Sequence, residues 1–419
     1  MTALASRVTA ALDARLLADD PAPVALAVSG GGDSVALLHL TADWARARAR
    51  PLVVLHVDHG LNPDSPHWRD RVKGLAERLA ASFRSARWDG PFPRTGLPAA
   101  ARAARHAHLA DMAREAGARV ILTGHTADDV AEGEWMKGEG ATLGTLRDWS
   151  PSPAWPEGRG LMMLRPLLGE RRADLRQLLQ ARGEDWTDDP ANADPRFLRS
   201  RARAALADRP PDIPSRAVGS PPAPLDVDPH GVIRGPRTVS GEALAFALVV
   251  AGGGDRLPRG RRLAALQDRL AGGQSFEAGL VGARLMAGAD GIMIVRETGN
   301  YRRSGEPRVP LVPGRDTVWD GRFALMSDEA GWTIMPLAGR AARLGPSDRA
   351  EVRALPAPMR PGLPVLVRDD GTGPVLAQSR VRVEALAGER LALGLGQVVH
   401  EADLKCRREW RTRDRVSIL

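Results

Sequence analysis

The chain has 419 residues, of which 43% are hydrophobic and 26% charged, as in a globular protein of two or three domains. Its single cysteine, Cys406, excludes disulfides and zinc or iron–sulfur clusters built from this chain alone, so a cytoplasmic protein is expected. The formal charge of +8 comes almost entirely from arginine, a composition that fits both phosphate binding and a GC-rich coding sequence.

The first half of the chain predicts an α/β fold. An amphipathic helix covers about residues 1–20 and lacks the apolar core of a signal peptide, and no apolar run is long enough to span a membrane. Short apolar strands are then expected at Val24–Val28, Leu52–Val57 and Arg119–Thr123, each followed by an unusual loop and a helical pattern. Such βαβ units form a parallel sheet, whose loops at the carboxyl ends of the strands make a ligand crevice.

The remaining elements suggest several domains. Helices are expected at Pro98–Ala116, from Ala173 to Gly183, near Gly241–Ala251 and near Arg259–Ala271. We expect a catalytic domain at 1–206, a proline-rich linker at 207–227, a mixed, partly helical region at 228–300 and a C-terminal domain at 301–419. The parts after the linker are expected to be smaller helical and mixed α/β domains.

The loop SGGGDS follows the first strand and precedes a helix, an arrangement that presents glycine amides and a helix N-terminus to an anion. No lysine follows, so it is not the phosphate loop GxxxxGK[ST]. Asp33 would repel a polyphosphate unless a cation such as Mg²⁺ lay between them. The alternative is a plain glycine turn with Asp33 and Ser34 capping the helix. The candidate ATP-binding residues are Ser29, Gly30, Gly31, Gly32, Asp33 and Ser34.

Four polar residues open the helix after the third strand: His125, Asp128, Asp129 and Glu132. Helical spacing places Asp128 on one face with both His125 and Glu132. This grouping suits either a magnesium site or a pocket for a cationic amine, whereas the alternative is an acidic first turn favoured by the helix dipole.

Four arginines are candidates for contacting RNA phosphates or an adenylate. Arg102 and Arg105 share one face of the helix at 98–116, and Arg199 and Arg203 lie in the segment RFLRSRARAAL. A solvated arginine face is the alternative for each of them.

Several motifs in fixed order resemble known families. SGGGDS resembles the pyrophosphatase loop of the N-type ATP pyrophosphatases, the PP-loop superfamily. HVDHGLNPDSPHW resembles the HVxHGLxxxxxxW signature of the tRNA(Ile)-lysidine synthetase family. AARAARHAHLADMA, TGHTADDVAE, and LRPLLGERRADLRQLL followed by WTDDPANADPRFLRSRAR resemble further elements of that family. The lone, distant Cys406 argues against the sulfur-inserting relatives, which use cysteine pairs.

The resemblance implies an ATP-dependent ligase. The C2 oxygen of the wobble cytidine of tRNA(Ile), with its CAU anticodon, would attack the ATP α-phosphate and release pyrophosphate. Free L-lysine would then displace AMP and form lysidine. It implies ATP and Mg²⁺ as cofactors, with Asp33 on magnesium. It also implies catalytic roles for Asp33, His125, Asp128, Asp129 and Glu132, substrate binding by 228–300 and tRNA binding by 301–419. The oligomeric state stays open, with a homodimer as one alternative.

This sequence departs from the family pattern on the expected substrate side. Val130 stands in place of glutamine, Gly133 in place of threonine, and Lys137–Gly140 in place of Arg-Gly-Ser-Gly. Ser200 replaces an asparagine. These changes leave open a PP-loop ligase that adenylates another RNA or a small molecule, or an RNA-binding paralogue with weakened catalysis.

Overall fold

The computed structural model describes residues 2–60, 65–141, 143–188, 196, 198–207, 225–258, 260–299, 301, 305–368 and 370–404. The chain divides into two compact units, one formed by Met1–Gly219 with Val398–Leu419 and the other by Ser220–Gln397. Most of the expected proline-rich linker, 208–224, lies outside the described residues, as does Cys406. Among the helices described, none combines the length and the apolarity needed to cross a membrane.

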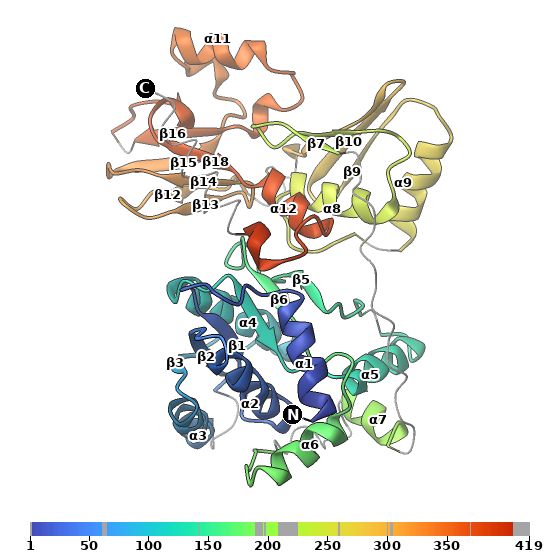
Figure 1. The fold of residues 1–419 in the computed structure, drawn as a ribbon. Helices are drawn as coiled ribbons and strands as arrows, with labels where there is room; N and C mark the ends of the chain where they lie inside the picture. Colours follow the sequence, from blue (N-terminus) through green and yellow to red (C-terminus); the bar gives the residue numbers. More distant parts are fainter. Residues whose placement is uncertain are drawn as a thin grey trace. The chain divides into compact units, whose positions relative to one another are not determined.

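The first unit is built on one sheet with the strand order β3-β2-β1-β4-β6-β5 (Figure 1). Its strands are β1 (Val24–Ala27), β2 (Leu52–Asp58), β3 (Ser82–Arg87), β4 (Val120–Thr123), β5 (Trp149–Pro151) and β6 (Met162–Leu164). Neighbouring strands run parallel except β5, which pairs antiparallel with β6. The predicted α/β class with a parallel sheet is therefore confirmed.

Helices cover both faces of this sheet. They are α1 (Ala3–Asp13), α2 (Gly32–Arg46), α3 (Ser65–Arg78), α4 (Leu97–Glu115), α5 (Ala127–Gly138), α6 (Arg172–Ala181) and α7 (Leu198–Ala205). Leu109 and Met112 of α4 pack on alternate strand residues such as Val53 and Ile121. Because parallel crossovers are right-handed, α2 and α3, which lead outward from β1 to β3, lie on the opposite face from α4, which leads back to β4.

The sequence analysis missed β3, and the structure explains why. This strand lies at the edge of the sheet, and the side chains of SFRSAR are exposed or half-buried. Charged side chains on an edge strand prevent pairing with other chains, but they also remove the apolar run by which a strand is recognised. The strands β5 and β6 were missed as well, since they span only three residues each.

The order of the strands creates a switch point beside β1. From β1 the chain builds outward through β2 to β3, and then returns to β4 on the other side of β1. The loops after β1 and β4 therefore lie side by side where their helices diverge, which is where open α/β sheets bind ligands. These loops are SGGGDS and GHTADD.

The end of the described chain returns to the first unit. Trp149 in β5 donates a hydrogen bond from Nε1 to the carbonyl of Val398 (2.8 Å). Glu401, only 1% exposed, accepts hydrogen bonds from Arg50 Nη2 (2.7 Å) and Arg119 Nη2 (3.0 Å). A buried ion cluster thus holds residues that are separated by about 280 to 350 positions in the sequence.

The second unit contains antiparallel sheets with helices packed on them (Figure 1). Its strands are β7 (Asp226–Val227), β8 (Ile233–Gly235), β9 (Phe276–Leu280), β10 (Ala283–Gly288), β11 (Gly291–Arg296), β12 (Val309–Pro310), β13 (Thr317–Trp319), β14 (Phe323–Met326), β15 (Trp332–Pro336), β16 (Pro364–Arg368), β17 (Val375–Leu376) and β18 (Arg382–Ala385). Its helices are α8 (Gly241–Ala251), α9 (Arg261–Ala271), α11 (Pro346–Ala354) and α12 (Ala387–Gly394). The expected helices near 241–251 and 259–271 are confirmed by α8 and α9.

Candidate active site

The carboxyl edge of the first unit's sheet contains a pocket of about 1030 Å³, large enough for a nucleotide and part of a second substrate. Almost every residue that the sequence singled out lines it. These residues are Ser29, Gly31, Gly32, Asp33, Ser34, Arg102, Arg105, His125, Asp128, Asp129, Glu132, Arg199 and Arg203. Gly30 is the exception, because it faces Val72 and Thr187 at the back of the loop.

The SGGGDS loop has the shape of an anion-binding turn. Gly30 has a φ of +96°, which L side chains rarely adopt, and its carbonyl accepts a hydrogen bond from the Thr187 N–H (2.9 Å). Gly31 is the N-cap of α2 and has no side chain to cap the first turn, so the N–H groups there remain available for a ligand. The Ser34 hydroxyl donates to the Gly31 carbonyl (2.8 Å) and fixes the turn.

The loop after β4 approaches the SGGGDS loop closely and holds it in place. A Cβ on Gly124, at the end of β4, would lie 3.0 Å from the Asp33 carbonyl oxygen and 3.2 Å from the Ser34 nitrogen. Glycine therefore lets the loop after β4 pack directly against the loop after β1, where a Cβ would crowd the backbone of Asp33 and Ser34. This contact places the acidic start of α5 next to the phosphate loop.

The acidic residues of α5 divide differently from the sequence-based expectation. Asp129 and Glu132 meet the same guanidinium groups, whereas Asp128 accepts a hydrogen bond from the backbone N–H of Arg172 (2.8 Å) and caps α6. Asp129 is held by the N–H and hydroxyl of Thr126 in a capping box, 2.9 and 3.1 Å away. The tertiary contact with α6, rather than helical spacing, thus selects which acids act together.

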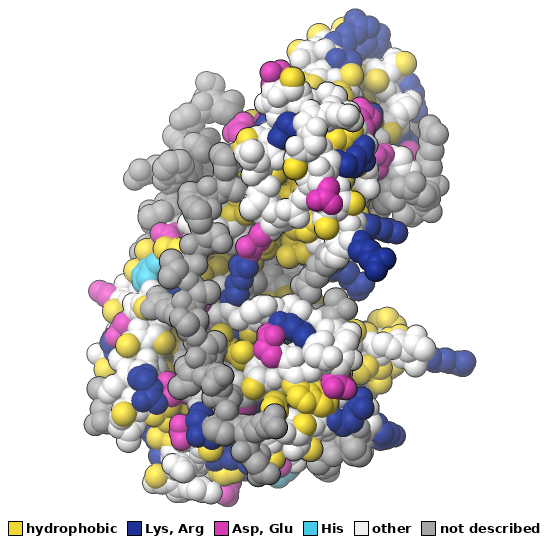
Figure 2. Space-filling view, turned by 90° about the vertical axis from the view of Figure 1, so that its right-hand side faces the viewer, with side chains coloured by type: hydrophobic (Ala, Val, Ile, Leu, Met, Phe, Trp, Pro, Cys, Tyr) yellow, Lys and Arg dark blue, Asp and Glu magenta, His cyan; other side chains and the backbone are white. Residues whose placement is uncertain are grey.

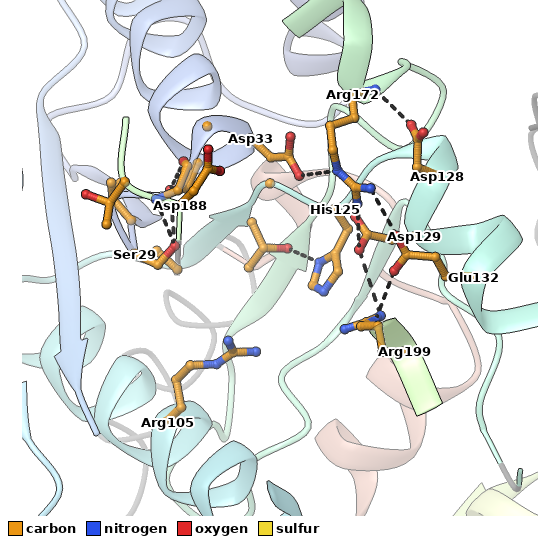
Figure 3. Close-up of a pocket in the computed structure, with 18 of the residues that line it drawn as sticks. Ser29, Asp33, Arg105, His125, Asp128, Asp129, Glu132, Arg172, Asp188 and Arg199 are labelled. Atoms are coloured by element: carbon orange, nitrogen blue, oxygen red, sulfur yellow. Dashed lines mark hydrogen bonds and ion pairs between the residues drawn. The ribbon is translucent and has the colours of Figure 1, made fainter. Parts of the chain in front are cut away.

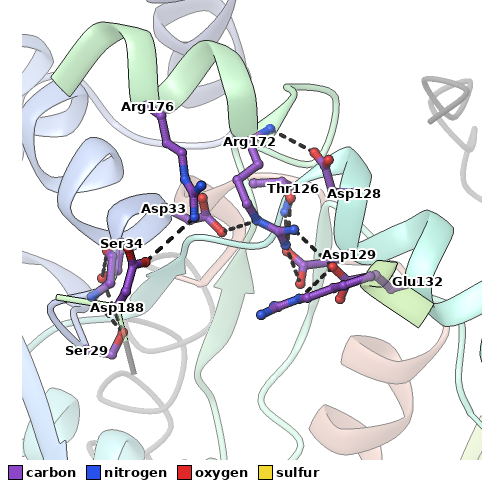
Figure 4. A network of polar contacts seen from close by, with 12 residues as sticks. Ser29, Asp33, Ser34, Thr126, Asp128, Asp129, Glu132, Arg172, Arg176 and Asp188 are labelled. Atoms are coloured by element: carbon purple, nitrogen blue, oxygen red, sulfur yellow. Dashed lines mark hydrogen bonds and ion pairs between the residues drawn. The ribbon is translucent and has the colours of Figure 1, made fainter. Parts of the chain in front are cut away.

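Arg172 is the residue at this site that sequence reasoning missed. Its Nε lies 3.1 Å from Asp33 Oδ2, its Nη1 3.0 Å from Glu132 Oε1 and its Nη2 3.5 Å from Asp129 Oδ1 (Figures 3 and 4). The guanidinium therefore joins the phosphate loop to the acidic pair. The sequence analysis included Arg172 only as part of the segment LRPLLGERRADLRQLL, because an arginine at the start of a helix has no special meaning without the fold.

Arg199 and Arg203 extend from α7 to the same acids. Arg199 Nε lies 3.1 Å from Glu132 Oε2, and Arg203 Nε lies 2.9 Å from Glu132 Oε1. Glu132 is only 2% exposed, and these guanidinium groups are the charged partners of its buried carboxylate. Within the part of the chain that the structure describes, no cluster of three or more His, Cys, Asp or Glu residues is arranged to hold a metal ion.

Burial raises the pKa of the acids in this pocket, whereas nearby positive charge lowers it. Burial raises the pKa of Asp33 above its ordinary value, although Arg172 opposes this effect. Burial would also raise the pKa of Asp129, but the positive charge of Arg172 and the Thr126 hydrogen bond outweigh it and lower the pKa. Asp129 is therefore ionised at neutral pH.

The opposite wall of the pocket is cationic. Arg105 points toward the pocket from α4 (Figure 3), and burial followed by the charges of Arg102 and Arg199 lowers its pKa to about 10. No acidic side chain among the described residues pairs with Arg102 or Arg105. Such unpaired guanidinium groups in a pocket favour an anionic ligand.

Two histidines in this region stay neutral. Burial, with neighbouring positive charges, lowers the pKa of His106 to about 2. Burial also lowers the pKa of His125 to about 3, and its Nδ1 lies 3.0 Å from the Thr123 hydroxyl. His125 is therefore a hydrogen-bonding group at neutral pH and adds no charge to the site.

The positions that depart from the family pattern lie away from this pocket. None of the described residues Val130, Gly133, Lys137–Gly140 and Ser200 lines it. Glu139 is exposed at the end of α5, and Lys137 pairs with Glu134 on the same helix (2.6 Å). The substituted side chains therefore do not form part of the pocket wall that contains Asp33, Asp129 and Glu132.

Charge on the face shown in Figure 2 gives no comparable signal. On the face shown in Figure 2, Lys and Arg side chains form separate groups interspersed with Asp and Glu. The net charge of +8 is therefore dispersed on this face, and the pocket arginines carry the argument for an anionic ligand.

The phosphate loop without a lysine, set at the switch point of a parallel sheet, defines a PP-loop ATP-using domain. The family model described as a PP-loop domain matches residues 3–209. A U34-tRNA thiolase from Methanococcus maripaludis is similar in structure, with a TM-score of 0.40 and 16% identity, covering 49% of this chain and 71% of that one.

Curated relatives show which family of PP-loop enzymes the chain belongs to. The tRNA(Ile)-lysidine synthase of Caulobacter vibrioides is 45% identical over 405 residues, which cover 94% of this chain and 98% of the relative. That of Mesorhizobium japonicum is 34% identical over 375 residues, covering 78% of each chain. The chain belongs to the tRNA(Ile)-lysidine synthase family and is an ATP-dependent ligase.

Proposed function

We propose that this chain ligates free lysine to C2 of the wobble cytidine of tRNA(Ile) with a CAU anticodon, through an O-adenylyl intermediate. The observation that carries the proposal is the similarity along nearly the whole chain to a tRNA(Ile)-lysidine synthase, together with a pocket that joins an anion loop, an acidic pair and unpaired arginines. The region 228–300 would bind substrate and 301–419 would bind tRNA. We also propose that the protein is cytoplasmic.

In the first step, the cytidine O2 attacks the ATP α-phosphorus, an O–P bond forms and pyrophosphate leaves. The N–H groups of Ser29–Ser34 and the N-terminus of α2 would hold the phosphates in line. Mg²⁺ usually binds through one or two carboxylates plus substrate phosphates, so Asp33 fits it as a single protein ligand. When bound, the ion would neutralise phosphate charge. Arg102 and Arg105 would contact the adenylate or a tRNA phosphate.

In the second step, the lysine ammonium first loses a proton to water, and the neutral amine attacks C2 to form the C–N bond. The C2–O bond breaks, AMP leaves, and the nitrogen gives a second proton to water. Asp129 and Glu132 would attract the incoming ammonium and orient it, and Asp128 would keep α6 in register by holding the Arg172 N–H. The neutral His125 would hydrogen-bond a substrate, since its pKa of about 3 leaves it uncharged.

The test is incorporation of radiolabelled lysine into acid-precipitable RNA, with ATP, magnesium and a tRNA(Ile) transcript carrying CAU. We expect incorporation that is lost when the wobble cytidine is replaced by uridine. Asp33→Asn should abolish it, whereas Asp70→Asn, on an exposed aspartate, should not. Pyrophosphate release with other RNAs or amines but no lysine incorporation would instead indicate a ligase for another acceptor. No release with any acceptor would indicate an RNA-binding paralogue.

A further inference from the structure

Arg172 occupies the boundary between the nucleotide loop and the acidic pair, Asp129 and Glu132. Its backbone is fixed, because it begins α6 and its N–H is held by Asp128 (2.8 Å). Its side chain is shared, since Nε meets Asp33 at 3.1 Å while Nη1 meets Glu132 at 3.0 Å. A movement of this guanidinium toward the SGGGDS loop or toward the acidic pair therefore changes the charge balance at both places.

The acidic pair is already neutralised by side chains of this chain. Glu132 Oε1 faces Arg172 and Arg203, at 3.0 and 2.9 Å, and Oε2 faces Arg199 at 3.1 Å. Asp129 Oδ2 accepts hydrogen bonds from Thr126. A ligand ammonium that binds this pair therefore competes with these guanidinium groups.

The cluster is nevertheless incompletely hydrogen-bonded. Glu132 Oε2, Arg172 Nη2 and Arg199 Nε are buried and lack a hydrogen bond of good geometry, although oppositely charged atoms lie nearby. Buried polar atoms in native proteins are nearly always hydrogen-bonded, so these exceptions need an explanation. A rearrangement of the guanidinium groups when substrates bind would supply one.

We propose that Arg172 couples the two substrate sites: phosphates at the SGGGDS loop draw its guanidinium away from Asp129 and Glu132, which then accept the lysine ammonium. This inference rests on the proposed function, because it takes lysine as the second substrate. The charges of Asp33, Asp129 and Glu132 are balanced by Arg172, Arg199 and Arg203. An anion on one side and a cation on the other therefore each lower the cost of binding the other.

Such coupling is reciprocal and measurable without turnover. If the nucleotide raises lysine affinity by a given factor, lysine must raise nucleotide affinity by the same factor, which we expect to be about fivefold or more. Arg172 would be a positioning residue in this scheme. It would let each substrate raise the affinity for the other without itself touching the reacting cytidine.

The experiment is calorimetric titration of lysine into the full-length protein, with and without saturating α,β-methylene-ATP and magnesium. This analogue cannot be cleaved between its α- and β-phosphates, so no reaction occurs. In the wild type we expect lysine to bind about fivefold or more tightly in the presence of the analogue. Equal lysine affinity in both titrations would overturn the inference.

Variants then assign the coupling to Arg172. Without the analogue, Arg172→Ala should bind lysine more tightly than the wild type does. With the analogue, the variant and the wild type should bind lysine equally well. Arg172→Lys should also lose most of the coupling, since an ammonium cannot bridge several carboxylates as a guanidinium does. Arg182→Ala is the control, because Arg182 follows the last residue of α6, pairs with Asp43 (2.7 Å) and does not line the pocket. It should keep the wild-type coupling.

The outcomes distinguish a failure of the coupling through Arg172 from a failure of the proposed function. If an Arg172 variant keeps the wild-type coupling factor, Arg172 does not connect the sites, while the proposed function stands. If the wild type binds the analogue but never lysine, the proposed second substrate is wrong and the coupling fails with it. The circular dichroism spectrum of each variant shows whether it is folded.

Discussion

Glu401→Ala offers the sharpest test of how the end of the chain is integrated into the catalytic unit. The Glu401 carboxylate is buried and accepts from Arg50, Arg119 and the Leu17 N–H (2.7, 3.0 and 3.0 Å). Truncation would leave guanidinium groups buried next to an empty space. We therefore expect loss of stability in the unit that contains the active site.

The magnitude follows from what each arginine retains. Removing one member of a buried pair costs about 3–5 kcal/mol. Arg119 would keep Asp20 at 2.7 Å, and Arg50 would keep the carbonyl of Ala22 at 2.9 Å, so the lower end of that range applies. For a unit of this size, each kcal/mol lowers Tm by about 2–4 °C, which gives a fall of about 6–12 °C.

The assay is thermal unfolding of the full-length protein followed by calorimetry and by near-ultraviolet circular dichroism. Asp70→Ala is the control, because Asp70 pairs with Arg69 on the surface, where the side chains are 62% and 45% exposed. That change should cost less than about 1 kcal/mol. A Glu401→Ala protein that melts within about 2 °C of the wild type would refute the reasoning, since the buried charges would then be compensated in some other way.

Three further predictions concern the pocket. Asp33→Ala should abolish pyrophosphate release because the proposed magnesium ligand would be lost, and near-normal turnover would contradict that role. Gly124→Ala should raise the KM for ATP by about tenfold or more, since its Cβ would displace the SGGGDS loop. Gly133→Ala is the control: it has open space around it, so it should leave the KM unchanged and stabilise α5 by up to about 1 kcal/mol. The pKa of His106 is lowered to about 2, so below pH 6.5 the unfolded chain binds a proton that the folded chain does not, and stability falls as the pH falls. His106→Tyr should remove the contribution of His106 to this pH dependence, which approaches about 1.4 kcal/mol per pH unit. Urea unfolding at pH 5 and 7 measures it, and an equal loss of stability in both proteins would contradict the prediction.

Much of the site could be read from local sequence. SGGGDS follows β1 and GHTADD follows β4, and the carboxyl ends of parallel strands lie along one edge of the sheet, so the loops had to meet. The apolar runs around Leu26, Val54 and Ile121 predicted the strands because each is buried on both faces. The motifs in their fixed order indicated the family that the relatives support.

Other features had no local signature. The exposed edge strand β3 lacks an apolar run, and Arg172 resembles any arginine that begins a helix. Helical spacing favoured Asp128 with Glu132, but the position of α6 paired Asp129 with Glu132 and left Asp128 as a cap.

The sequence by itself determined the class of fold, the nucleotide loop and the family, because these depend on short patterns whose geometry is set within one strand, turn or helix. Only the tertiary structure decided which charges share a partner. Arg172 is 139 positions from Asp33, and Glu401 is 351 positions from Arg50. Contacts at such separations depend on how the whole unit packs, and a buried charge reveals its partner only when the surrounding chain has removed water from both.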